Sequence, residues 1–354
     1  MAEGRGDRVT SSLDHRLGGW LAVALALALI ALPWVAQALG GEFYIGLASR
    51  ILIFALAATS LNLVLGFGGM VSFGHAAFVG LGAYSVAVLA QAGIDQALVA
   101  WPLAMAVAGL AALAIGAVSL RTQGVYFIMI TLAFAQMLYF LMVSLKALGG
   151  DDGLNLAGRS KLPGLDLADD TRLYYAVLVA CALGFLAVWR LLNAPFGHAL
   201  QAVRENPVRM AALGFPVRRI QLAAFTVAGA LGGLAGALLA NHGSFVSPSL
   251  MQWHQSGVLM VMVILGGVGH LWGGVIGAAA FLLLEEFLSH YTIHWQFALG
   301  AILYEMLTGA APFSGDSVSG GKTSTSGVCG DGRVMTATSV LIWRDQTIRA
   351  PARP

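Results

Sequence analysis

Three polar side chains lie close together inside an apolar stretch of the chain. Asn62, Ser72 and His75 flank a glycine-rich run at 66–74. Irregular backbone at membrane depth is tolerated where it lines a cavity or is buried in protein. An amide, a hydroxyl and an imidazole beside such a break predict a solute pathway; close helix packing with satisfied polar side chains is the alternative, and the sequence leaves both open. The candidate pathway residues are Asn62, Gly69, Ser72, Gly74 and His75.

Patterns typical of catalysis are missing. The sequence has no Cys/His spacing for a metal site, no nucleophile elbow and no glycine-rich nucleotide fingerprint between a strand and a helix. The nearest approach to a phosphate-binding loop is 319–323, but its upstream glycine, Gly315, lies one residue too far away. We interpret this match as chance, and expect no catalytic residue, metal or cofactor in the chain itself.

A polar, basic segment at 193–219 separates two long apolar runs. We call it the island. Its 27 residues exceed the about two to eight that often join neighbouring helices. Its middle part, 199–213, has a helix-like composition, and its positive charge places it on the cytoplasmic side of a membrane. We therefore predict a short helix under the membrane that offers small residues and charges to a soluble partner. The charged residues are Arg204, Arg209, Arg218 and Arg219, with Glu205 as the one acid.

Composition sets the class of protein that must position these residues. Of the 354 residues 58% are hydrophobic and only 10% are charged, with a mean hydropathy of +0.80. Soluble domains carry roughly 25% charged residues, so the composition predicts a multi-span membrane protein surrounded by lipid. The net charge of +2 does not indicate a nucleic-acid partner. Two cysteines, Cys181 and Cys329, are too few for a disulfide framework.

Apolar runs of about 20 residues mark the expected spans. The last run would be ~50 Å long as one straight helix, too long for a hydrocarbon core of ~30 Å, so we expect it to break at 266–269 or at 273–274. Six crossings before the island place the leader, 1–18, on the cytoplasmic side with it. The expected spans are 19–39, 45–65, 71–92, 97–118, 124–146, 172–192, 219–240 and the interrupted region 256–288.

Two further patterns concern packing and the C-terminal end. The spacing of Gly229 with Gly233, and of Gly232 with Gly236, predicts tight helix contacts. The segment 295–307 is short for a last span, and the tail 309–354 is rich in Gly, Ser and Thr with no run long enough to cross a membrane. This composition predicts a disordered tail after a transmembrane domain at 19–308.

Several stretches together resemble a known family. They are TSLNLVLGFGGMVSFGHAAFVGLGAY at 59–84, GVYFIMITLAFAQMLYF at 124–140 with GGDDGLNL at 149–156, the long stretch FGHALQAVRENPVRMAALGFPVRRIQLAAFTVAGALGGLAGAL at 196–238, and VILGGVGHLWGGVIGAA at 263–279. Their combination resembles the LivM-like group, the inner-membrane permease subunits of ABC importers for branched-chain amino acids. The resemblance covers most of 45–290. The end departs from it, and 298–317 is instead similar to a fragment of a protein-kinase lobe without a kinase catalytic loop.

The resemblance implies a role for the island and a set of partners. In such permeases this loop couples the membrane subunit to the ATP-binding subunits. The implied partners are a second permease subunit, two cytoplasmic ATP-binding subunits that bind ATP and Mg, and an external solute-binding protein. Leucine, isoleucine and valine are the implied solutes, with urea or short amides as related ones. The implied ATPase-coupling residues are Arg204, Glu205, Asn206, Pro207, Ala211, Ala212, Leu213 and Gly214.

These observations predict an all-α polytopic integral membrane protein with about 8–10 transmembrane or re-entrant helices and a cytoplasmic coupling helix. We expect a permease in the bacterial inner membrane, with a cytoplasmic N-terminus and no ATPase site of its own. The alternative is a self-contained channel or ion-coupled carrier. The glycine-rich break favours a carrier, because carriers use discontinuous helices. The lack of charged residues for ion coupling within the apolar runs argues against it.

Overall fold

The computed structural model describes residues 27–34 and 42–291, apart from 157, 163–164 and 168, together with residue 300. The chain forms two compact units, Met1–Leu284 and Glu285–Pro354. The predicted leader, the segment 295–307, the loop-like match at 319–323, Cys329 and the tail 309–354 lie outside the described residues. Of the predicted first span, 19–39, only 27–34 is described, and it is helical.

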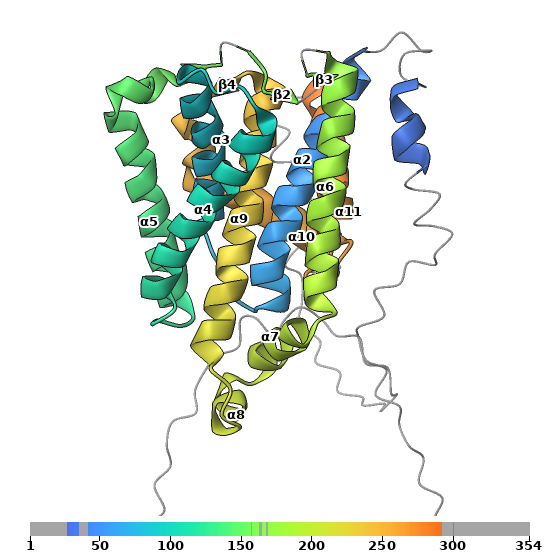
Figure 1. Ribbon diagram of the computed structural model, residues 1–354. Helices are drawn as coiled ribbons and strands as arrows, with labels where there is room; N and C mark the ends of the chain where they lie inside the picture. Colours follow the sequence, from blue (N-terminus) through green and yellow to red (C-terminus); the bar gives the residue numbers. More distant parts are fainter. Residues whose placement is uncertain are drawn as a thin grey trace, which may run out of the picture. The chain divides into compact units, whose positions relative to one another are not determined.

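The described part of the chain is almost entirely helical (Figure 1). The helices are α2 (Glu42–Asn62), α3 (His75–Gln91), α4 (Ala97–Ser119), α5 (Val125–Ser144), α6 (Asp170–Leu192), α7 (Pro195–Glu205), α8 (Pro207–Ala212), α9 (Val217–Gly243), α10 (Trp253–Gly266) and α11 (Gly273–Tyr291). A π-helical turn, η1 (Leu63–Phe67), extends α2, and 3-10 turns lie at η2 (Lys146–Leu148), η3 (Gly150–Asp152) and η4 (Pro248–Met251). Two-residue antiparallel strands pair β1 (Leu154–Asn155) with β4 (Phe245–Val246), and β2 (Lys161–Leu162) with β3 (Leu165–Asp166).

Five of the described helices are long and apolar enough to cross a membrane. They are Phe43–Phe67, which joins α2 to η1, and α4, α5, α6 and α9. The all-α polytopic class is thus confirmed, and the predicted spans 45–65, 97–118, 124–146, 172–192 and 219–240 coincide with helices of sufficient length and apolar composition. The predicted span 71–92 is wrong at its start, because the chain is not helical between Gly68 and Gly74 and α3 begins at His75. Region 256–288 breaks as predicted, after Gly266.

α9 is the central helix, and it packs against α4, α3 and α2. The apolar windows of α2 with η1 and of α9 are 78% and 67% buried, whereas that of α5 is only 22% buried, so α5 lies at the periphery. The two glycine spacings on α9 serve different neighbours. Gly233 approaches Ala104 of α4, and Gly236 approaches Val79 and Ala83 of α3. Small residues let these backbones come close, as the spacing predicted.

The Gly236→Ala substitution is expected to destabilise the protein by about 1–3 kcal/mol, the usual cost of overpacking a core. A Cβ on Gly236 would lie 2.7 Å from the carbonyl carbon of Val79 and 3.0 Å from the nitrogen of Ala83. Gly257→Ala is the matched control, because a Cβ there meets nothing within 4 Å. The midpoint of thermal unfolding in detergent is measured for both variants. Equal midpoints for Gly236→Ala and Gly257→Ala would contradict a tight α3–α9 contact.

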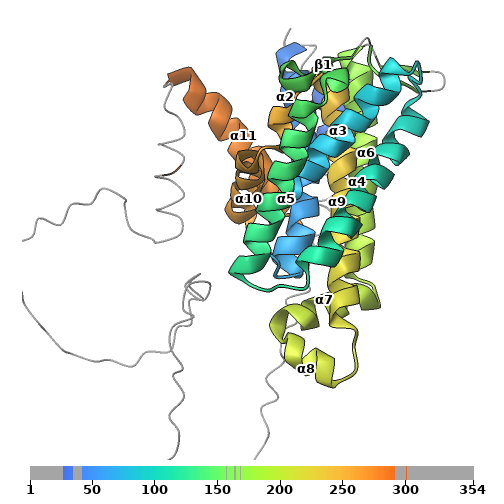
Figure 2. The same ribbon diagram turned by 90° about the vertical axis from the view of Figure 1, so that its left-hand side faces the viewer.

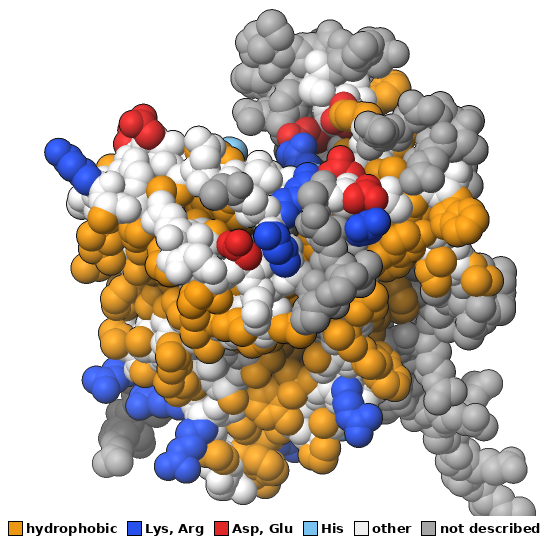
Figure 3. All heavy atoms as spheres, turned by 45° about the horizontal axis from the view of Figure 1, so that its top comes forward, with side chains coloured by type: hydrophobic (Ala, Val, Ile, Leu, Met, Phe, Trp, Pro, Cys, Tyr) orange, Lys and Arg blue, Asp and Glu red, His pale blue; other side chains and the backbone are white. Residues whose placement is uncertain are grey.

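Charged side chains separate into two rims around an apolar band (Figure 3). One rim in this view carries both signs, and the other shows Lys and Arg. α7 lies under the ends of α2 and α6, beside the last turns of α9 at that end, and α8 lies further out (Figures 1 and 2), so the island is at one end of the helices. The connection from α5 to α6, with its short strands, lies at the opposite end (Figure 1). This agrees with the predicted placing of the island and of the acidic 149–171 stretch on opposite faces.

Candidate functional site

The first helix break follows α2. The π-helical turn η1 ends with bonds from the Gly68 nitrogen to the Leu63 carbonyl (3.1 Å) and from the Met70 nitrogen to the Val64 carbonyl (3.0 Å). Gly69 then takes a φ of +67°, a left-handed conformation that only glycine adopts readily. The chain stays irregular until α3 starts at His75. The predicted interruption at 66–74 is therefore confirmed.

The second break separates α10 from α11. α10 ends at Gly266, and the left-handed conformation of Gly269 (φ +82°) helps to turn the chain before α11 begins at Gly273. The Trp272 ring leans on Phe185 of α6, with ring centroids 4.6 Å apart. The turn between α10 and α11 is therefore held against the bundle by an apolar contact.

The two breaks touch each other through Asn62. Its Oδ1 accepts from the Gly269 nitrogen at 3.0 Å, and its Nδ2 donates to the His270 carbonyl at 2.7 Å. A Cβ on Gly66 would lie 2.5 Å from the Gly269 nitrogen, so the two backbones are in direct contact. Asn62 is 1% exposed. The structure thus places this candidate pathway residue as a clamp between the breaks, with its amide bound to backbone.

The other candidate pathway residues are placed as follows. His75 is fully buried, with Nε2 2.7 Å from the Ser60 hydroxyl and Nδ1 without a hydrogen-bond partner among the described residues. The Ser72 hydroxyl is buried and accepts from the Gly74 nitrogen at 3.2 Å. A Cβ on Gly74 would lie 3.0 Å from the Thr131 carbonyl of α5. These three residues are packed within the bundle, and Gly69 is the exposed member of the set.

The island folds into two helices where one was expected. α7 ends at Glu205 and α8 begins at Pro207, with Asn206 between them in an extended conformation (φ −152°, ψ 93°). The prediction of one helix over 199–213 is therefore wrong, because proline disfavours a helical residue before it and lacks an N–H for the helix. The Asn206 side chain caps α8 by accepting from the Arg209 nitrogen at 2.9 Å.

The island has an inner apolar face and an exposed tip. Leu200 and Val203 of α7 and Met210 of α8 are buried. Val208 is 78% exposed and Phe215 is 47% exposed. Neither is among the predicted coupling residues, although large apolar residues in a polar segment are a signal that the sequence contains. Among the predicted coupling residues Pro207 is half-buried, and the exposed ones are Arg204, Glu205, Asn206, Ala211, Ala212, Leu213 and Gly214.

Arg204 differs from its exposed neighbours in where its guanidinium lies. Nη1 donates a hydrogen bond to the Gly66 carbonyl at the first break. The aliphatic part of the side chain covers Gly69, since a Cβ there would lie 2.8 Å from Cγ of Arg204. The structure therefore joins one predicted coupling residue to the predicted pathway segment.

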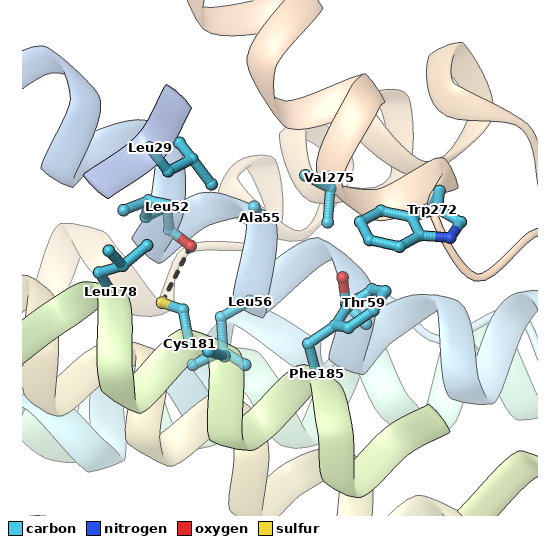
Figure 4. A pocket seen from close by; sticks show the side chains of 11 residues that line it. Leu29, Leu52, Ala55, Leu56, Thr59, Leu178, Cys181, Phe185, Trp272 and Val275 are labelled. Atoms are coloured by element: carbon cyan, nitrogen blue, oxygen red, sulfur yellow. Dashed lines mark hydrogen bonds between the residues drawn. The ribbon is translucent and has the colours of Figure 1, made fainter. Parts of the chain in front are cut away.

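A cavity of about 170 Å³ lies between α2, α6 and α11 (Figure 4). Thr59 contributes a hydroxyl, and the Cys181 thiol donates to the Leu52 carbonyl at 3.3 Å. None of the eleven lining residues is charged. A free amino acid carries an ammonium and a carboxylate, whose burial without partners is costly, so this cavity suits an apolar group.

Comparisons with known proteins point to one group. The family profile described as branched-chain amino acid transport system / permease component matches residues 43–310. The high-affinity branched-chain amino acid transport system permease protein LivM of Salmonella typhimurium is 28% identical over 310 residues, 80% of this chain and 72% of that protein. LivM of Escherichia coli is 27% identical over the same shares. The guanosine ABC transporter permease protein NupQ of Bacillus subtilis is 28% identical over 86 residues, 24% of this chain and 27% of that protein. No solved structure matches.

Proposed function

Because this chain belongs to the family of permease components of branched-chain amino acid transport systems, we propose that its island docks on ATP-binding subunits that drive transport through it. The chain is a multi-pass membrane permease subunit for branched-chain amino acid import.

The observation that carries the proposal is the position and surface of the island. α7 and α8 lie between two spans, α6 and α9, and project beyond the bundle (Figures 1 and 2). Val208, Leu213 and Phe215 expose apolar side chains there, at 78%, 66% and 47%. Exposed apolar groups rimmed by charges are typical of a protein interaction site. A soluble partner would cover them.

The proposed assembly has four kinds of member. This chain pairs in the lipid bilayer with a second permease subunit of the same family, and two cytoplasmic ATP-binding subunits dock on the islands. These subunits bind ATP and Mg, and in this proposed assembly the permease itself needs no ATPase site and no cofactor. An external solute-binding protein delivers the solute. We place the assembly in the bacterial inner membrane with the N-terminus of this chain in the cytoplasm. This placing is supported by the basic character of the island.

The proposed solutes are leucine, isoleucine and valine. Their support is the function of the two LivM relatives, each matched over 72% of its length. Urea and short amides remain within the proposal as related small solutes. The guanosine permease matches only 24% of this chain, so it does not extend the proposal to nucleosides.

Leu213→Asp is expected to reduce the co-purification of ATP-binding subunits by at least about tenfold, because it puts a charge into an apolar surface that the docked subunit would bury. The test is affinity purification of the tagged permease from cells that express the whole gene cluster. Phe245→Asp is the control, since Phe245 is also exposed (44%) but belongs to β4, away from the island. Isolation of a transport-active permease without any ATP-binding subunit would favour the self-contained carrier.

A further inference from the structure

Arg204 links the island to the first helix break. It belongs to the last turn of α7, and its Nη1 donates to the Gly66 carbonyl in η1. The last carbonyls of a helix lack partners within the helix, and a cation near that end is also favoured by the helix dipole. A hydrogen bond from a charged donor is stronger than a neutral one. The guanidinium therefore caps α2 and η1 from a different element.

The same side chain also lies against the second break. A Cβ on Gly269 would be 3.2 Å from Nη1 of Arg204 and 3.6 Å from the Gly66 carbonyl oxygen. At the other end of the side chain, Gly69 leaves room for the Arg204 stem. Arg204 is thus held along its length between the two breaks, although the residue as a whole is exposed at the edge of the island.

Asn62 completes this junction from inside the bundle. Its amide binds the backbone of Gly269 and His270, while Gly66 lies one turn further along the same helix.

Apolar side chains join the same elements. One buried apolar cluster contains Leu63 and Phe67 of η1, Leu200 of α7 and Leu271 of the second break. Polar and apolar contacts therefore join α7, η1 and the α10–α11 turn into one packed unit.

We propose that Arg204 is a positioning residue that transmits movement of the island to both helix breaks, and that Asn62 makes the two breaks move together. The proposal rests on the proposed function, in which the ATP-binding subunits move the island. It gives Arg204 an internal role and leaves docking to Glu205 and to the exposed apolar tip of the island, Val208, Leu213 and Phe215. An arginine suits this role because its planar fork has several donors in fixed geometry, which a lysine lacks.

Hydrogen exchange on the purified full-length permease tests the link without any partner subunit. Arg204→Ala is expected to speed exchange at 63–74 and at 265–273 by about tenfold or more, the loss of one hydrogen bond from a charged donor. Arg204→Lys is expected to give a smaller effect. Arg209→Ala is the matched control, because Arg209 is an exposed arginine of α8. Unchanged exchange at 265–273 in Arg204→Ala would overturn the proposal.

The assembled importer gives a second, independent readout. The Arg204→Ala permease is expected to keep its ATP-binding subunits, while its uptake rate falls about tenfold. Adding Asn62→Ala to this variant is expected to lower the uptake rate little further, because the effects of coupled residues are not additive. Loss of the subunits to the extent seen with Leu213→Asp, or fully additive losses, would overturn the internal role. If the unaltered permease binds no ATP-binding subunit, the proposed function fails, and the exchange experiment still decides whether Arg204 links the breaks.

Discussion

Gly69→Leu is expected to reduce transport by at least about tenfold, while Gly93→Leu leaves most of it. Both glycines are left-handed, with φ of +67° and +78°, so leucine strains the backbone equally at both. They differ in their surroundings. A Cβ on Gly69 would lie 2.8 Å from Cγ of Arg204, whereas a Cβ on Gly93 meets nothing within 4 Å. The difference between the two variants therefore measures the displacement of Arg204 from the first break.

Uptake in proteoliposomes or cells, normalised to the amount of permease in the membrane, checks this prediction. Gly74→Leu is expected to behave like Gly69→Leu, because a Cβ there would lie 3.0 Å from the Thr131 carbonyl. Its control is Gly257→Leu, since Gly257 also lacks a left-handed φ and its Cβ position is open. Equal losses at Gly69 and Gly93 would mean that the glycine-rich break is ordinary scaffold.

The spans could be predicted because they depend on local composition. Backbone groups in lipid must be bonded within the protein, and continuous apolar runs of about 20 residues, such as 97–118 and 172–192, meet this demand as helices. The helix breaks near Gly69 and after Gly266 could also be predicted from the sequence, because clustered glycines weaken a helix. Helix boundaries and breaks in such a chain are thus largely local properties.

The junction of the two breaks could not be predicted from local patterns. Asn62 and His270 are 208 positions apart along the chain, and their contact depends on how α2, α10 and α11 pack. The sequence therefore indicates Asn62 as a candidate, because it is a polar residue in an apolar run, but it does not indicate the backbone groups that the Asn62 amide binds. The split of the island into α7 and α8 does have a local signal, since an Asn–Pro pair often marks the end of one element and the start of another, but we predicted one helix there.

The direction of the Arg204 side chain illustrates the same limit. Its place in a basic segment predicted a surface role, shared with the other island arginines. Whether a long side chain points outward or back to its own bundle depends on an acceptor nearby in space, here the Gly66 carbonyl. Carbonyls without a partner inside the helix occur at every helix end, and the glycine run creates such an end beside the island. The two sequence signals, the glycine run and the basic island, therefore have to be combined in three dimensions.

Glu205→Arg is expected to uncouple ATP hydrolysis from uptake: uptake falls by at least about tenfold, while the permease still inserts and hydrolysis by the partner subunits continues. Glu205 is exposed in the last turn of α7 and is the one acid among four arginines of the island. A partner that docks there faces this carboxylate with a donor or a cation. Reversing the charge then sets like charges against each other, which costs several kcal/mol at an interface.

Two variants separate this effect from a general change in charge. Glu205→Gln keeps the shape of the side chain and its ability to accept a hydrogen bond, so it is expected to retain more uptake than Glu205→Arg. Asp152→Arg reverses an exposed acid of η3, in the connection at the opposite end of the bundle, and is expected to leave the ratio of ATP hydrolysed to solute imported unchanged. Measuring both rates in reconstituted membranes gives that ratio directly. Normal uptake by Glu205→Arg would remove Glu205 from the docking surface and leave its apolar tip as the contact with the ATP-binding subunit.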